Sequence, residues 1–160
     1  MKLFVVVVVA LLLGFNPIAS QAGTPINIIG SAEGVAIRGY DTVAFFTQKK
    51  AVQGSPEYRF DWAGAKWLFI SDENLQKFRQ NPEQWAPQYG GHCALGMAEG
   101  YVSKKPTSGD FEVIDGKLYL FPLGNPGGPS AYSAWRRYAK FNVVAGDKNW
   151  PRFKEELEAK

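Results

Sequence analysis

The sequence is poor in the residues on which most metal and catalytic sites depend, since its 160 residues include one cysteine and one histidine. A single cysteine cannot form an internal disulfide, and it falls well short of the paired Cys-x-x-Cys signal of a thiolate metal site. A single histidine without a Ser–His–Asp arrangement provides no visible machinery for hydrolysis. The glycine-rich stretches at 34–39 and 124–128 are not followed by Lys-Ser or Lys-Thr, so neither is a phosphate-binding loop. These absences favour a binding or structural protein over an enzyme.

The chain also has little excess of positive or negative charge. Its 18 Lys and Arg residues are nearly balanced by 15 Asp and Glu residues, and the formal net charge is +3. The basic pairs at 49–50, 104–105 and 136–137 are scattered along the chain. This balance gives no reason to expect nucleic-acid binding. For the same reason we expect no membrane binding once the N-terminal segment has been removed.

The first 22 residues have the pattern of a secretory signal peptide. Lys2 provides the positive start, residues 3–13 are unbroken apolar, and small residues lead up to Ala22. The apolar run is shorter than the roughly 20 residues that a membrane-spanning helix needs. We therefore expect cleavage after about Ala22 and a mature protein, residues 23–160, that is periplasmic or secreted.

The mature chain alternates short strand patterns with short helix patterns. Residues 58–62 and 66–70 predict one hairpin, and 111–114 and 117–121, joined by Asp-Gly, predict a second. Helices are predicted after Ser71, over 92–99, over 130–141 and over 147–160 with Pro151 in its first turn. Aromatic residues make up 14% of the chain and can fill a compact core. The sequence thus predicts a small single α+β domain of β-hairpins with short packed helices.

Several motifs of the mature chain resemble those of exported YHS-domain proteins. The relevant segments are GYDTVAFF at 39–46, WAGAKWLFIS at 62–71, NLQKFRQNP at 74–82 and PQYGGHC at 87–93. The resemblance implies a core motif at about 35–100, within a single YHS-type domain that continues through a hairpin and helical extension at 101–160. It also implies metal binding through cysteines, and some exported members look like selenoproteins with selenocysteine at the position of Cys93.

The sequence departs from the metal-binding members of that family. In those members, which this chain otherwise resembles, one cysteine follows the first motif and another follows the first hairpin. Here the corresponding segments are 41–44 and 69–71, and neither contains cysteine. The thiolate pair of the family therefore cannot be assigned to this chain, and any metal site has to be built around Cys93.

The residues around Cys93 suggest how such a site would be composed. If residues 92–99 are helical, Cys93 and Met97 are four residues apart and share one face. A thiolate with a thioether favours a soft, copper-like ion such as Cu(I). His92 is a third candidate ligand, although it lies about 100° round the helix from Cys93. A position near the start of a helix is expected to lower the pKa of the thiol.

Two other interpretations remain open at this point. Cys93 can instead be a redox-active thiol that exchanges with a partner protein, or a small buried side chain in a structural or interaction domain. Met97 can be core packing, and His92 can cap the helix or contact backbone. The leading hypothesis is a soft-metal module with Cys93, Met97 and His92 as ligands, and the expected partner is a metal ion or, for the redox alternative, a redox protein.

Overall fold

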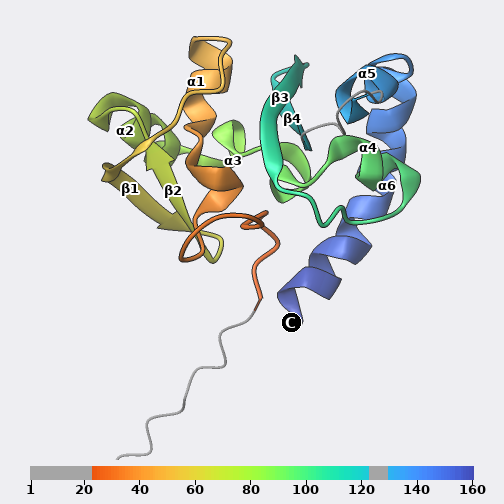
Figure 1. Ribbon diagram of the computed structural model, residues 1–160, viewed down its shortest axis with the longest axis horizontal. Coiled ribbons are helices and arrows are strands. Elements are labelled where there is room, and N and C mark those ends of the chain that lie inside the picture. The colour runs from red at the N-terminus through yellow and green to blue at the C-terminus, as the bar shows by residue number, and fades with distance from the viewer. Residues whose placement is uncertain (1–22, 123–129) are drawn as a thin grey trace, which may run out of the picture.

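The computed structural model describes residues 23–122 and 130–160, and it confirms the α+β class (Figure 1). The predicted signal peptide and the glycine-rich segment at 124–128 lie outside these ranges. None of the described helices is both long and apolar enough to cross a membrane. The elements in chain order are η1 (Ala36–Gly39), α1 (Thr42–Thr47), β1 (Ser55–Trp62), β2 (Ala65–Phe69), α2 (Asp72–Gln80), α3 (Pro82–Trp85), η2 (Gln88–Gly91), α4 (Ala94–Glu99), β3 (Thr107–Ile114), β4 (Lys117–Pro122), α5 (Ala131–Arg136) and α6 (Ala139–Glu158).

The first hairpin, β1 with β2, forms as predicted and packs against α2. Alternation along β1 turns its aromatic side chains to the same face, where Trp67 of β2 is 1% exposed. Phe78 of α2 packs on this face, with ring centroids 5.0 Å from Trp67 and 5.2 Å from Phe69. A first core results. It consists of Ile26, Ala36, Ile37, Val43, Phe45, Ala65, Trp67, Phe69, Phe78, Ala86, Leu118 and Leu120.

A buried carboxylate ties the elements of this half together. Asp41 has no exposed surface and caps α1, because its Oδ1 accepts from the backbone N–H groups of Val43 at 2.8 Å and Ala44 at 3.2 Å. Its Oδ2 accepts from the N–H of Ile70 at 2.9 Å and from Nδ2 of Asn74 at 2.7 Å. Asp41 therefore holds the turn before α1 and links it to the end of β2 and to α2.

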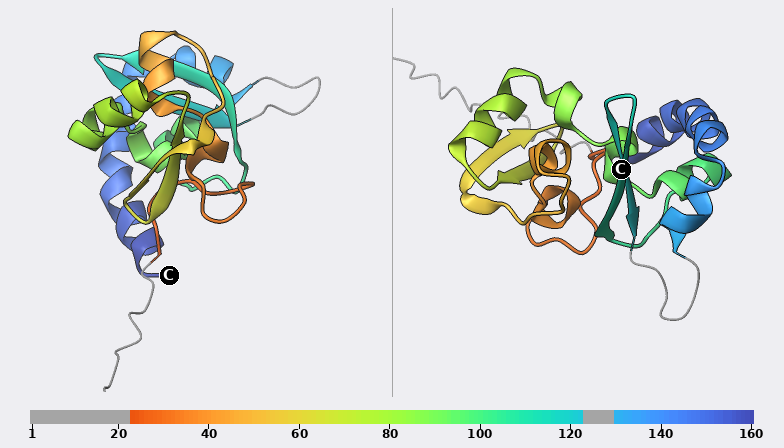
Figure 2. Two further views of the ribbon diagram at one scale, coloured as in Figure 1. Left: turned by 90° about the vertical axis from the view of Figure 1, so that its left-hand side faces the viewer. Right: turned by 90° about the horizontal axis from the view of Figure 1, so that it is seen from above.

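The second hairpin, β3 with β4, stands between the two halves of the molecule (Figures 1 and 2). Its turn is the predicted Asp115-Gly116 pair, with φ of 50° and 74°. Because side chains alternate along a strand, Leu118 and Leu120 of β4 belong to the first core while Tyr119 and Phe121 belong to a second. This second core consists of Tyr89, Ala94, Met97, Tyr119, Phe121, Trp135 and Phe153.

The helix predicted over 92–99 begins two residues late, at Ala94. Cys93 has extended backbone, with φ −54° and ψ 116°, and pairs with Leu120 of β4 in a parallel bridge. This long-range pairing draws the chain out of the helical conformation that local sequence favours. The helix ends at Gly100, in the left-handed region at φ 87°, as predicted.

The C-terminal helices also differ from the prediction. The segment expected as one helix over 130–141 breaks after α5, and α6 then runs through to Glu158 with Pro151 inside it. Pro151 cannot donate to the carbonyl four residues before it, which normally interrupts a helix. Here Gly146 and Phe153 are buried on either side of the exposed Pro151, so tertiary packing carries the helix through.

Candidate functional site

The loop that precedes Cys93 has an unusual backbone. Tyr89, Gly90 and Gly91 follow one another with φ of 57°, 60° and 81°. A Cβ on Gly90 would lie 2.1 Å from the carbonyl oxygen of Pro25, and one on Gly91 would lie 2.4 Å from Cγ2 of Ile37. Neither position has room for a side chain, so the glycine pair allows the chain before Cys93 to touch the N-terminal segment.

Residues 23–29 cross this glycine pair and form what we call the N-terminal strap. Asn27, which is 2% exposed, donates from its backbone to the carbonyl of Gly90 at 2.8 Å and from Nδ2 to the carbonyl of Gly91 at 3.0 Å. Thr107 at the start of β3 donates its hydroxyl to the same Gly91 carbonyl at 3.1 Å. Sequence reasoning missed Asn27 and Thr107, because polar residues 64 and 16 positions from Gly91 carry no local signal of this contact.

Cys93 caps the start of α4. Its Sγ accepts from the backbone N–H of Gly96 at 3.4 Å, and its side chain is only 6% exposed against β4. Burial raises the pKa of the thiol, although the N–H groups of Gly96 and Leu95 act in the opposite direction. The lowered pKa expected for a thiol at a helix start is therefore wrong for this chain, because desolvation outweighs the amides.

His92 is the most unusual polar group of the described structure. It is 3% exposed, and neither Nδ1 nor Nε2 has a hydrogen-bond partner. Burial lowers the pKa of its ring from 6.5 to about 4; the carbonyl of Pro25 opposes this shift without reaching hydrogen-bond geometry, and Lys160 adds to it slightly. The imidazole is consequently neutral at physiological pH, with an unshared electron pair on one ring nitrogen.

Met97 lies one turn along α4 and is fully buried in the second core. Its backbone N–H donates to the carbonyl of Cys93 at 3.0 Å, and its carbonyl accepts from Nδ2 of Asn149 in α6 at 2.9 Å. Because Cys93 is outside the helix, spacing along α4 no longer supports a common face for the two sulfur atoms. His92 and Cys93 are thus neighbours along the chain with non-helical backbone, and Met97 is held one helical turn further on by its backbone.

The donor set is small. Within residues 23–122 and 130–160, no group of three or more His, Cys, Asp or Glu side chains is arranged to hold a metal ion. Any site at Cys93 therefore depends on one thiolate and one imidazole, with the thioether of Met97 as a third donor. Soft ions such as Cu(I) accept such low coordination with sulfur and nitrogen ligands, whereas Ca²⁺ and Mg²⁺ require six or more oxygen ligands.

The motif tyrosine links the loop to the C-terminal helix. The hydroxyl of Tyr89 donates to Oδ1 of Asp147 at 3.0 Å and lies 3.3 Å from the carbonyl oxygen of Val143. Gly146 allows this approach, since a Cβ there would lie 2.5 Å from the tyrosine oxygen. Burial and the neighbouring carboxylate raise the pKa of Tyr89 far above its ordinary range, so Tyr89 remains a neutral anchor.

A groove of about 730 Å³ runs along the outer side of the same loop, between the two halves of the molecule. Three aromatic rings wall this groove. Cys93 itself does not line it. The rings are those of Trp62, Tyr89 and Trp150.

Comparison with protein families gives one match, to the YHS domain, over residues 43–89. Searches of curated proteins and of solved structures found no match. The matched region runs from α1 through the first hairpin to Tyr89, and it ends three residues before His92. It thus covers the elements from α1 to α3 and the start of the loop that precedes the candidate ligands. The chain therefore contains a YHS domain at residues 43–89.

Proposed function

We propose that the protein binds a soft, copper-like metal ion through Cys93 and His92, with Met97 as a third ligand. YHS domains are often linked to metal binding, and in this chain an imidazole and a thiol follow each other directly at His92 and Cys93. Residues 1–22 have the features of an export signal, so we expect the ion to be met in the periplasm or outside the cell.

The unpartnered ring of His92 is the observation that carries this proposal. A buried donor or acceptor without a partner costs about 1–3 kcal/mol, and such atoms are rare in folded proteins. Among the described side chains only three buried nitrogen or oxygen atoms lack a partner: both ring nitrogens of His92 and Nε1 of Trp135. A metal ion bound to one ring nitrogen of His92 would remove the cost of leaving that nitrogen without a partner. The thiol of Cys93 would provide the second ligand.

The chemistry of the site is consistent with this role. His92 is already neutral at physiological pH and needs no deprotonation before it binds a metal. Cys93 has a raised thiol pKa and must lose its proton to the solvent when the ion arrives. Burial of both groups excludes competing water and oxygen ligands, which favours a soft ion.

A structural role for Cys93 is the second candidate, because its sulfur caps α4 and its side chain is buried. In that case serine would serve equally well, since serine is a good helix cap. The same burial and the raised thiol pKa count against a redox-active thiol, which needs access and thiolate character.

Titration with Cu(I) under anaerobic, reducing conditions tests the proposal. We expect tight binding of one equivalent by the wild type and a loss of affinity of at least about hundredfold in Cys93→Ser, which keeps the cap but removes the thiolate. Met97→Leu keeps the volume and should weaken binding about tenfold. Binding that is absent in the wild type, or equal in Cys93→Ser, would show that Cys93 is structural.

A further inference from the structure

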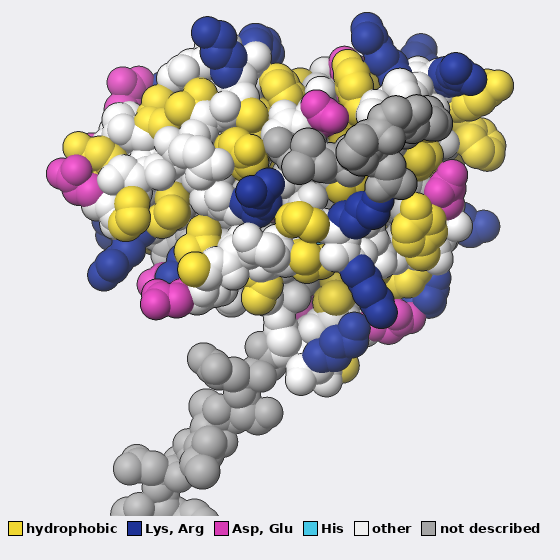
Figure 3. All heavy atoms as spheres, in the orientation of Figure 1, with side chains coloured by type: hydrophobic (Ala, Val, Ile, Leu, Met, Phe, Trp, Pro, Cys, Tyr) yellow, Lys and Arg dark blue, Asp and Glu magenta, His cyan; other side chains and the backbone are white. Residues whose placement is uncertain are grey.

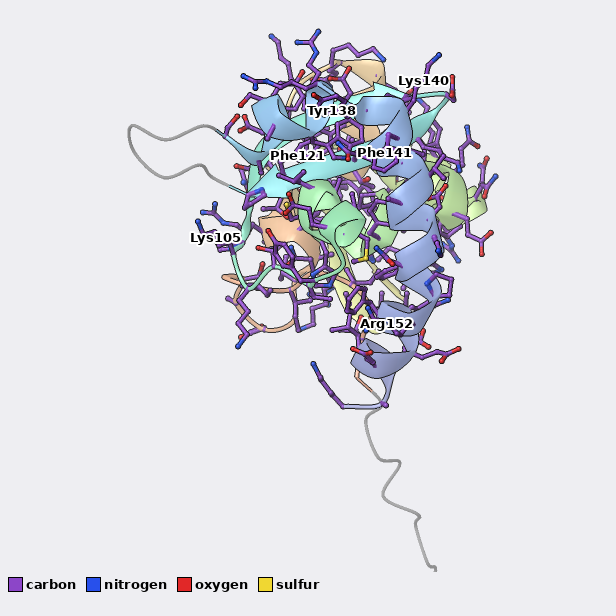
Figure 4. All side chains as sticks on the ribbon, turned by 90° about the vertical axis from the view of Figure 1, so that its right-hand side faces the viewer. Lys105, Phe121, Tyr138, Lys140, Phe141 and Arg152 are labelled. Carbon is purple, nitrogen blue, oxygen red and sulfur yellow. The ribbon has the colours of Figure 1, made fainter. Side chains whose placement is uncertain are left out.

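The corner between α5 and α6 carries most of the exposed large apolar surface of the described structure. Tyr138, Phe141 and Val144 are 69%, 73% and 70% exposed, and the fourth exposed large apolar residue, Tyr101, is 49% exposed. The three recur every third residue from the start of α6, so they lie along one side of the helix. Figure 4 looks onto this side and shows Tyr138 and Phe141 at the upper end of α6, while Figure 3 shows hydrophobic side chains projecting at the right-hand edge of the molecule.

Basic side chains surround these apolar groups. Arg136, Arg137, Lys140 and Lys148 are all exposed. Arg136 lies 3.9 Å from a carboxylate oxygen of Glu112, but none of the described carboxylates is within ion-pair distance of the other three. We call this surface the corner patch: the apolar residues Tyr138, Phe141 and Val144 with the basic residues Arg137, Lys140 and Lys148.

Two acidic side chains lie at the edge of the corner patch. Asp147 is exposed and lies next to Lys148 in the chain, and its carboxylate accepts from the hydroxyl of Tyr89. Glu99 lines a hollow of about 440 Å³ together with Arg137 and Tyr138. The corner patch itself thus holds three basic side chains and no acidic one, with Glu99 and Asp147 at its edge.

We infer that the corner patch docks the protein on an anionic lipid bilayer. Aromatic and aliphatic side chains that project between basic groups can enter the headgroup region while the basic groups contact phosphates. A second copy of the chain is a poor occupant, because two basic patches repel each other. The three apolar groups are strongly exposed at a helix corner, and a bilayer can deform around such projecting groups. The inference departs from the expectation drawn from net charge, and it does not depend on metal binding.

Co-sedimentation with lipid vesicles tests this inference. Protein isolated from cells, with its N-terminus determined by mass spectrometry, is mixed with vesicles of equal parts phosphatidylglycerol and phosphatidylcholine, and with vesicles of phosphatidylcholine alone. We expect binding to the anionic vesicles and at least about tenfold weaker binding to the neutral ones. Arg137→Glu/Lys140→Glu should reduce binding to anionic vesicles at least about tenfold, and so should Phe141→Ser/Val144→Ser.

Two matched variants separate the patch from general effects of charge and apolar surface. Lys49→Glu/Lys50→Glu makes the same change in net charge at an exposed pair elsewhere, and Tyr101→Ser removes an exposed ring outside the patch. Both should bind anionic vesicles within about twofold of wild type, because charges beyond about 8 Å are screened at physiological salt. Failure of the wild type to bind anionic vesicles, equal binding to neutral ones, or equal losses in the matched variants would overturn the inference.

Discussion

Replacing Gly90 with alanine should lower the free energy of unfolding by about 4 kcal/mol. A methyl group there would meet the backbone oxygen of Pro25 at 2.1 Å, and it would have to adopt φ 60°. The left-handed conformation costs a non-glycine residue about 1–2 kcal/mol, and overpacking adds about 1–3 kcal/mol. Relief of the clash requires movement of the N-terminal strap, which breaks the hydrogen bond from Asn27 to Gly90.

Gly116 provides the matched control. It has a similar φ of 74°, but a Cβ there would meet nothing within 4 Å. Gly116→Ala should therefore cost only the conformational strain of about 1–2 kcal/mol. Urea denaturation of both variants measures the difference. Equal losses would mean that the strap does not press on the Gly90 position as described.

Acid should destabilise the protein through His92 before it affects the protein in other ways. The ordinary pKa of 6.5 applies to the unfolded chain, whereas burial depresses the folded pKa to about 4. The unfolded state therefore binds the proton first, and stability present above pH 6.5 is lost as the pH falls towards 4. Between about pH 7.5 and pH 4.5 the loss should reach about 2–3 kcal/mol, at about 1.36 kcal/mol for each unit of pKa difference.

The variant His92→Leu isolates this contribution, because the chain has no other histidine. The free energy of unfolding of this variant should decrease less than that of the wild type over the same pH range. The difference between the two decreases is the contribution of His92. Urea denaturation of the metal-free proteins at both pH values provides the measurement. Identical falls would mean that the ring of His92 titrates as freely in the folded protein as in water.

Local patterns in the sequence predict much of this fold. The Asp115-Gly116 turn, the alternation along β1 and the Ser71 cap of α2 each depend on residues close together in the chain, and the structure has all three. The predictions are wrong where contacts with residues distant in the sequence determine the local structure. Pairing with Leu120 delays α4 to Ala94, and packing of α6 on the second core carries that helix through Pro151. Tertiary contacts outweigh local propensity at both places.

The same distinction applies to the candidate site. Sequence alone singles out Cys93, His92 and Met97, and it places Cys93 at a helix start, which by itself predicts a reactive thiolate. Burial against β4 reverses that expectation, because desolvation of the sulfur depends on a strand that follows much later in the chain. The isolation of the His92 ring could not be predicted either, since it depends on what does not lie beside it once the chain has folded.

The described contacts connect the YHS-matched region to the candidate ligands. Tyr89, the last residue of the match, anchors α6 through Asp147, and the glycine pair that follows is clamped by Asn27. His92 and Cys93 come directly after this clamp, so their backbone is fixed from both sides. If the two side chains bind an ion as proposed, no loop has to be ordered first.

Nitrogen NMR of the protein labelled with ¹⁵N-histidine tests the proposed metal site most directly. Without a histidine tag, both ring-nitrogen resonances belong to His92, the one histidine of the chain. One equivalent of Cu(I) should shift one of these resonances and remove the signal of the metal-free form in the wild type, but not in Cys93→Ser. Resonances that stay at their metal-free positions after Cu(I) has been added, or that shift equally in Cys93→Ser, would contradict a site built on His92 and Cys93.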